Sequence, residues 1–283
     1  MRVQWVVALI LAFGAGCCWA QREQSLPPRQ LVREVVYNEL HDHQNHGYWS
    51  YWVEQHSRAD TRLEEQIETT AGPVSRLILI DGRLLNAEAL QQEQARLESL
   101  LSSPEKQARK RQEYADDEKR IGRIVALLPD AFLYDYAGEE NGCYRLRFRP
   151  DPDYPAHSIE ARIFHAMTGE LWIDAGSKRL ARLEGHLEQN VDFGFGILGR
   201  LDKGGWFRLQ RTRTSATDWK TDQLEIHMSG RALLFKTIAR ETSQTRGGFA
   251  AVPPGMSLAQ AIDILRPLPT NASAAPTSLA FRH

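Results

Sequence analysis

The sequence predicts an α+β protein built mainly on antiparallel β-structure. From Gly47 onward, apolar and polar residues alternate in short segments over most of the chain, as they do in half-buried strands. Turn signals separate these segments at hairpin spacing, which favours a meander over βαβ units. Residues 86–128 change to a helical period and supply the main helices.

The N-terminus has the pattern of an export signal. Arg2 supplies a positive charge, and Val6–Phe13 is an apolar run that is too short to span a bilayer. Small residues precede a cut before Gln21. We therefore expect a signal peptide over residues 1–20, cleavage near Ala20-Gln21, and a mature protein outside the cytoplasm.

Two alternatives to cleavage stay open. The signal could remain as a membrane anchor, although its apolar run is short. Cys17 could instead be lipidated after Gly14-Ala15-Gly16, but this segment lacks the leucine that usually stands three positions before the cysteine.

Composition narrows the class of partner. The formal net charge is −1 and 25% of the residues are charged, so nothing indicates nucleic acid as a partner. After residues 1–20 no segment reaches transmembrane length, so we expect no integral membrane segment. Removal of the signal would leave Cys143 alone, and we expect a small core residue there rather than a reactive thiol.

The first element after the signal is a helix over residues 25–40. Ser25 can cap it, and the two prolines that follow suit its first turn. The polar loop His41–His46 comes next. Helix and loop together form an N-terminal segment, residues 21–46.

Strands begin where this loop ends. In the first strand, Trp49, Tyr51 and Val53 share one face. Two more strands follow, and the Asp81-Gly82 dipeptide after the last of them is a strong signal for a two-residue hairpin. We expect the three strands at residues 48–56, 61–69 and 74–80.

Residues 86–128 predict two helices. Asn86 can cap the first, while Ser102 and Glu105 have the spacing of a capping box for the second. The second helix is intensely charged over residues 106–120, where opposite charges one turn apart can pair. The plain interpretation is a solvated helix face, and the alternative is a docking site for an envelope protein. The expected pairs are Arg109 with Glu113 and Asp116 with Arg120.

After Pro129 the alternation returns and predicts a series of strands. The chain then ends in a C-terminal segment, residues 250–283, with a short helix over residues 257–265 and a flexible tail. The alternating segments are residues 143–149, 158–165, 169–174, 178–189, 205–213, 223–229 and 231–239.

No catalytic motif survives inspection. Gly194, Gly196 and Gly199 match G-x-G-x-x-G, but a strand pattern follows them where a dinucleotide site needs a helix. We therefore expect a bend in the sheet at this point. The hydrolase signatures are also missing from the sequence. We expect no cofactor and no enzymatic activity.

One histidine cluster offers a second hypothesis. His41, His43 and His46, with Asp42, have ligand types that suit zinc or copper, and His56 could join them. A metal-assisted hydrolase that uses the His41–His46 loop is therefore an alternative function. The plainer interpretation is a set of exposed, hydrated side chains on a polar loop.

Seven aromatic side chains lie on or beside the later strands. They belong either to a sheet face covered by helices or to a concave apolar surface that can hold an acyl chain. These candidate ligand-lining residues are Trp172, Phe193, Phe195, Trp206, Phe207, Trp219 and Phe235.

Three segments, taken with the order of the elements, resemble a known family. They are Leu79–Arg83 (LIDGR) before the helices, Gly169–Asp174 (GELWID) and Asp218-Trp219 at the start of a late strand. Over about residues 46–249 the chain resembles the LolA/LolB-like periplasmic proteins of the outer-membrane lipoprotein-sorting type. It looks closest to uncharacterised envelope proteins of that superfamily.

This resemblance implies a strongly curved antiparallel sheet, an incomplete β-barrel, with two or three helices packed against its concave face. It implies a half-barrel domain over residues 47–249, with residues 86–128 as a helical insertion. It also implies a periplasmic, non-enzymatic protein that binds a lipid, a lipidated molecule or another apolar ligand in the cavity of the sheet. The alternatives are the hydrolase above and an envelope scaffold without ligand.

Overall fold

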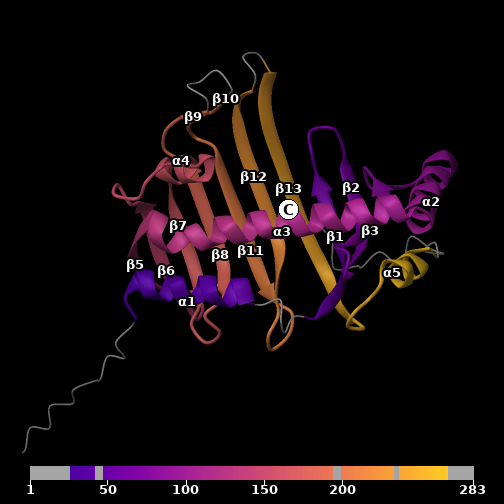
Figure 1. Ribbon diagram of the computed structural model, residues 1–283, viewed down its shortest axis with the longest axis horizontal. Helices are drawn as coiled ribbons and strands as arrows, with labels where there is room; N and C mark the ends of the chain where they lie inside the picture. The colour runs from indigo at the N-terminus through magenta and orange to yellow at the C-terminus, as the bar shows by residue number, and fades with distance from the viewer. Residues whose placement is uncertain (1–25, 42–46, 194–198, 233–235, 267–283) are drawn as a thin grey trace, which may run out of the picture.

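One antiparallel sheet of thirteen strands forms the body of the protein (Figure 1). The computed structural model describes residues 26–41, 47–193, 199–232 and 236–266. The strands are β1 (Tyr48–His56), β2 (Thr61–Ile67), β3 (Val74–Ile80), β4 (Arg83–Leu84), β5 (Phe132–Glu140), β6 (Cys143–Pro150), β7 (Met167–Asp174), β8 (Leu180–Leu187), β9 (Val191–Phe193), β10 (Gly199–Leu201), β11 (Trp206–Arg213), β12 (Trp219–Ala232) and β13 (Lys236–Val252).

The order of the strands shows an open sheet. Across the sheet it runs β4-β3-β2-β1-β13-β12-β11-β8-β7-β6-β5, and the short β10 and β9 add beside the far end of β12. Strand β1 pairs with the last strand, β13, and so connects the N-terminal strands β1–β4 to the rest of the sheet. The two end strands, β4 and β5, do not pair with each other within the described residues, so the sheet is not closed. The expected α+β fold with a curved antiparallel sheet is confirmed.

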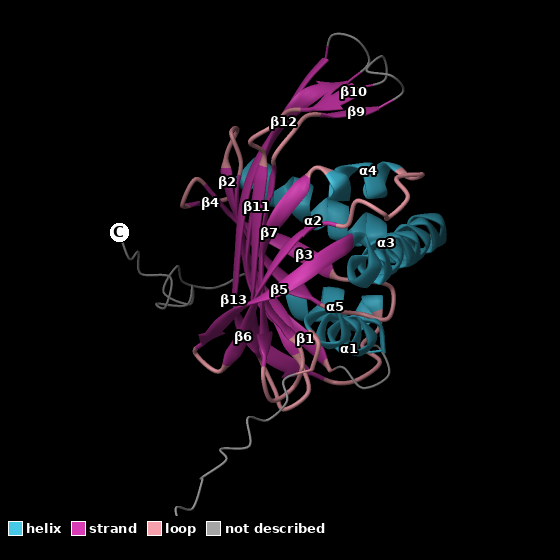
Figure 2. Cartoon of the chain, turned by 90° about the vertical axis from the view of Figure 1, so that its left-hand side faces the viewer, coloured by secondary structure: helices cyan, strands magenta, loops and turns pink. Residues whose placement is uncertain are grey.

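Five helices in the described residues pack against this sheet. They are α1 (Pro28–His41), α2 (Ala87–Ser102), α3 (Pro104–Ala131), α4 (Ile159–His165) and α5 (Leu258–Leu265). Figure 2 shows α1, α3 and α4 on one side of the sheet. No described helix has the length and apolar character that a membrane span requires.

The larger core lies between α1, α3, α4 and the β5–β8 end of the sheet. The register places Leu146 of β6 opposite Leu171 of β7, and Leu171 opposite Leu183 of β8, so their side chains share one face. Helix α1 buries four residues in this core, Leu31, Val32, Val35 and Val36. The helix of the N-terminal segment is therefore part of the main core.

The other end of the sheet holds two smaller clusters. Trp49, Tyr51 and Val53 of β1 are buried with Phe249 of β13 against them, as their alternation predicts. Ile67 of β2 pairs with Ser50, so it lies on the opposite face of the β1–β2 ribbon. There it joins residues of α2, β3 and α5 in a separate cluster. The β2–β3 end of the sheet is thus packed independently of the main core.

Helix α3 crosses in front of the sheet and buries little of itself (Figure 1). Its only buried residues are Pro129 and Ala131 in the last turn, and Ile121 is 53% exposed. A helix pressed on a sheet along its length would bury a continuous stripe. The charged stretch therefore forms the solvated face that the sequence predicts.

Two expected element boundaries are wrong. The second helix of residues 86–128 is capped by Ser103, whose side chain accepts the Lys106 amide, and not by Ser102. The strand expected over residues 231–239 is instead shared between the end of β12 and the start of β13.

Three further sequence expectations need correction. Residues 158–165 were expected to alternate as a strand, but Ser158 caps the short helix α4. Arg120 pairs with Asp117 at 2.8 Å rather than with Asp116, while the Arg109–Glu113 pair forms at 3.5 Å. Cys143 is half-buried rather than a core residue. Burial, with the nearby carboxylates of Asp174 and Glu140, raises the pKa of its thiol and disfavours the reactive thiolate.

Candidate ligand cavity

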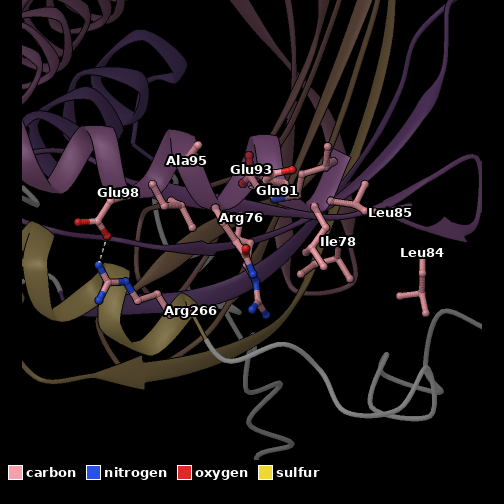
Figure 3. A pocket seen from close by; sticks show the side chains of 13 residues that line it. Arg76, Ile78, Leu84, Leu85, Gln91, Glu93, Ala95, Glu98 and Arg266 are labelled. Atoms are coloured by element: carbon pink, nitrogen blue, oxygen red, sulfur yellow. Dashed lines mark hydrogen bonds and ion pairs between the residues drawn. The ribbon is translucent and has the colours of Figure 1, made fainter. Parts of the chain in front are cut away.

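A cavity of about 680 Å³ opens between α2 and the β3–β4 hairpin. We call it the α2 cavity. Most of its wall is apolar, and Figure 3 shows the side chains that line it. The apolar lining residues include Ile78, Leu84, Leu85, Leu90, Ala95 and Leu97, and the charged ones are Arg76, Glu93, Glu98 and Arg266.

The hairpin and the helix cap form this cavity from a short stretch of sequence. Asp81 and Gly82 have φ values of +51° and +70°, which suit a two-residue hairpin turn, and β4 follows at once. The Asn86 side chain then accepts a hydrogen bond from the Ala89 amide at 2.8 Å and starts α2. The chain therefore folds back so that α2 covers the face of β3.

A register shift in β3 turns Ile78 into the cavity wall. Leu79 pairs with Leu63 and Leu77 pairs with Glu64, so Ile78 is the extra residue of a bulge. The buried Glu93 side chain of α2 accepts the Leu77 amide at 2.9 Å. Arg96 donates to both Glu93 oxygens at 2.7 Å, and these hydrogen bonds raise the pKa of Arg96.

Two guanidinium groups complete the lining. Arg76 of β3 is buried and forms an ion pair with Glu65 at 3.0 Å. Arg266, which follows α5, forms an ion pair with Glu98 of α2 across the mouth of the cavity, drawn as a dashed line in Figure 3. Arg76 is held within the wall, whereas the Arg266 and Glu98 side chains are 45% and 62% exposed.

Two of the predicted aromatic residues lie on the sheet face that α1, α3 and α4 leave uncovered. Trp172 alternates with Leu171 and Ile173, which belong to the main core, so its ring points the other way. Arg145 and Arg182 lie over that ring at 5.6 and 4.5 Å. Trp206 precedes Phe207, which packs against the main core, so the Trp206 ring also faces away from that core. It stacks on His227 of the neighbouring strand, with 5.9 Å between ring centroids.

Of the remaining predicted residues, the structure describes the side chains of Phe207 and Trp219. Phe207 packs against the main core, under the helices, and Trp219 is buried at the start of β12. The backbone of Phe193 belongs to β9, and its side chain lies outside the described residues, as do Phe195 and Phe235. The sequence alone does not indicate the α2 cavity, because Leu90 and Leu97 also fit the core-facing side of an ordinary amphipathic helix. The signal that could have pointed to it is the Leu84-Leu85 pair between the hairpin and the α2 cap.

The histidine and glycine motifs fall mostly outside the described residues. Residues 42–46 are among these, so the proposed metal cluster is not placed as a whole. Its two described members contact different neighbours. The ring of His41 stacks on Tyr37, and His56 Nδ1 lies 2.9 Å from Thr61 Oγ1. Of the glycine motif, Gly199 begins the strand β10. A strand therefore follows this motif, as expected.

Comparisons with known proteins find only distant likenesses, all of them to solved structures. No family model matches the chain, and no curated protein matches it. Among solved structures, a DUF1329 family protein from Desulfovibrio piger matches with 12% sequence identity and a TM-score of 0.30, covering 82% of this chain and 96% of that one. A likeness of this size assigns neither a family nor a function.

Proposed function

We propose that the protein is a non-enzymatic binding protein for a lipid, a lipidated molecule or another apolar ligand, and that it works in the periplasm. The observation that carries this proposal is the α2 cavity. Its volume of about 680 Å³ falls within the range of about 300–1,000 Å³ that is usual for small-molecule sites, and its walls are mostly apolar. The export pattern of residues 1–20 supports the location.

Burial of an alkyl chain supplies enough free energy for this role. Each methylene moved from water to an apolar wall contributes about 0.8 kcal/mol. A chain of roughly ten methylenes would therefore gain about 8 kcal/mol, against an association cost of at least about 4 kcal/mol. The net gain of at most about 4 kcal/mol corresponds to a Kd of about 1 mM from a chain of that length alone, and each further buried methylene tightens binding.

The polar groups of the cavity support binding rather than chemistry. Its described lining contains no serine, cysteine, histidine, lysine or tyrosine. The single buried carboxylate, that of Glu93, already accepts hydrogen bonds at both oxygens. Three donors on a carboxylate that can accept about four commit Glu93 mostly to the Leu77 amide and Arg96, which supports a structural role for it.

Lipid extraction and a fluorescent probe test the proposal together. Mass spectrometry of an organic extract of the purified protein should find bound lipid. N-phenyl-1-naphthylamine, an uncharged apolar probe, should gain fluorescence when it binds. Leu90→Gln, which places an amide in the wall of the α2 cavity, should weaken probe binding about tenfold, because the amide loses hydration without gaining a partner.

Two control variants locate the site. Leu209→Gln makes the same change at a half-buried leucine of β11, and Trp206→Ala removes the exposed aromatic ring of the uncovered sheet face. Both should leave probe binding within twofold of the parent protein. If these variants abolish binding and Leu90→Gln does not, the ligand lies on the sheet. If there is neither lipid nor probe binding, the proposed function is wrong.

A further inference from the structure

We infer that the ligand of the α2 cavity is a single-chain amphiphile with an anionic head, a carboxylate or a phosphate. This head replaces Glu98 as the ion-pair partner of the Arg266 guanidinium. This inference rests on the proposed function and adds the chemical class of the ligand. Three features of the cavity lead to it: the arrangement of charge along α2, the balance of hydrogen-bond donors and acceptors, and the exposure of one ion pair.

The lining of the cavity changes from apolar to charged along α2. Leu84, Leu85 and Leu90 lie at or before the start of the helix, and Glu98 near its end faces Arg266. Leu90 and Glu98 are eight residues apart, about 12 Å along the helix axis. Figure 3 shows the same order, with Arg266 and Glu98 at one end of the view and Leu84 and Leu85 at the other. Such a cavity suits a molecule with a tail and a head.

The hydrogen-bonding groups at the charged end favour an acceptor as the head. Both oxygens of Glu93 are occupied by donors from the protein. A guanidinium carries five N–H donors in a planar fork. Arg266 uses Nη2 on Glu98, and its Nη1 lies 3.6 Å from Asp263, beyond hydrogen-bond distance. The remaining donors fit a carboxylate or a phosphate, which can accept two of them side by side.

The ion pair at the mouth can be exchanged at little cost. Arg266 and Glu98 are both about half exposed, and such pairs contribute little to stability because water screens them. When a ligand anion takes the place of Glu98, the Glu98 carboxylate can return to solvent. Arg76 is buried and held by Glu65, so it stays in the wall when the exposed pair exchanges.

Calorimetric titration of the full chain with four probes of equal chain length tests the head group. The probes are dodecanoate, dodecyl phosphate, dodecanol and dodecylamine, each kept below its micelle concentration or, for dodecanol, below its solubility limit. We expect the two anions to bind at least tenfold more tightly than dodecanol, and dodecylamine to bind most weakly. The preferred anion tells whether a carboxylate or a phosphate head fits better. The preference should shrink as salt is raised, because the Arg266 end of the cavity is open to solvent.

Two variants test whether Arg266 binds the head group or serves only as a clamp, that is, an ion pair with Glu98 that holds α5 to α2. Arg266→Gln should weaken dodecanoate about tenfold and leave dodecanol unchanged. Glu98→Gln removes the competing carboxylate, so it should strengthen dodecanoate severalfold. A clamp role would instead make both variants weaken every probe alike. Arg33→Gln is the matched control, because Arg33 is an exposed arginine paired with Asp130 at 2.9 Å, on α1 and outside the cavity lining.

The outcomes distinguish the two proposals. Equal affinity for dodecanoate and dodecanol, or weaker dodecanoate binding by Glu98→Gln, overturns the anionic head and leaves the binding function intact. Failure of all four probes overturns both. If Arg266→Gln does not fold, the opposite-sign result expected for Glu98→Gln still decides the matter.

Discussion

Gly169 marks a place where two strands approach too closely for any side chain. A Cβ atom at this position of β7 would lie 2.0 Å from the carbonyl oxygen of Glu184 and 2.6 Å from Cζ of Phe148. The first neighbour is backbone of the paired strand β8, which cannot move without breaking the ladder. The close packing of β7 against β8 therefore requires a glycine at the first position of the GELWID segment.

Gly169→Ala should destabilise the protein by about 3 kcal/mol or more, because the overlap forces β7 and β8 apart. Gly247→Ala is the control, since a Cβ atom there meets nothing within 4 Å, and it should change the free energy of unfolding by less than about 0.5 kcal/mol. Urea denaturation followed by circular dichroism measures both. Equal stabilities of the two variants would contradict the close approach.

Single residues also show where sequence patterns stop being informative. The alternation of Leu171, Trp172 and Ile173 correctly predicts that the tryptophan faces away from its neighbours. It does not say which of the two faces the helices cover. Tryptophan suits either environment, because it can bury its ring in a core or place it under cations at a surface. The two arginines over Trp172 come from neighbouring strands, and only the register reveals them.

Helix α1 is fixed to the sheet by a partly buried cluster of charges. Glu39 near its end accepts Arg179 Nε at 3.1 Å and Arg211 Nη1 at 2.6 Å. The two arginine side chains are 8% and 12% exposed. A carboxylate between two largely desolvated guanidinium groups cannot be removed without leaving their charge uncompensated.

Glu39→Gln should therefore cost about 3 kcal/mol of stability, because the variant keeps one acceptor oxygen but leaves the two buried guanidinium charges without a counter-charge. Arg33→Gln, at the exposed pair on the same helix, should cost less than about 1 kcal/mol. The midpoint of urea unfolding measures the difference. If both variants lose the same small amount, α1 is held by its apolar stripe and the charge cluster adds nothing.

At the scale of elements, long periodic segments could be predicted and short ones could not. The helices α2 and α3 were predicted because many turns of the same period agree. The cap of α2 at Asn86 was predicted correctly, whereas α3 is capped by Ser103, one residue after the predicted Ser102. Helix α4 has only seven residues, too few to separate a period of two from one of 3.6. Its buried residues, Ala161 and Phe164, are three apart, which is the helical spacing that the strand prediction overlooked.

The candidate site depends on tertiary contacts that no local pattern contains. The hairpin and the α2 cap could be predicted, and so could a helix over residues 257–265. That Arg266 after α5 reaches Glu98 of α2 is a contact between residues 168 positions apart. The cavity therefore arises from the packing of two separately predictable pieces, and its charged end could not be foreseen.

Helices pack against one sheet in two separate regions of the described residues. The main core joins α1, α3 and α4 to the β5–β8 end, and the cluster around Ile262 and Leu265 joins α5 and α2 to β2 and β3. Helix α3 connects them but buries only its last turn. Regions that share few buried contacts open with different free energies, so the α2 cavity sits in a unit that can respond to a ligand by itself.

Ligand binding should therefore protect one end of the molecule from hydrogen exchange. A ligand that binds only the closed form at one hundred times its Kd stabilises that form by about 2.7 kcal/mol, which slows exchange about a hundredfold where opening releases the ligand. With dodecanoate present, amides of β3, α2 and α5 should slow, whereas those of β6 and β7 should change little. The Leu90→Gln variant should lose the effect. Slowing spread evenly over the sheet would mean that both regions open together, and slowing centred on β11 and β12 would place the ligand on the sheet face instead.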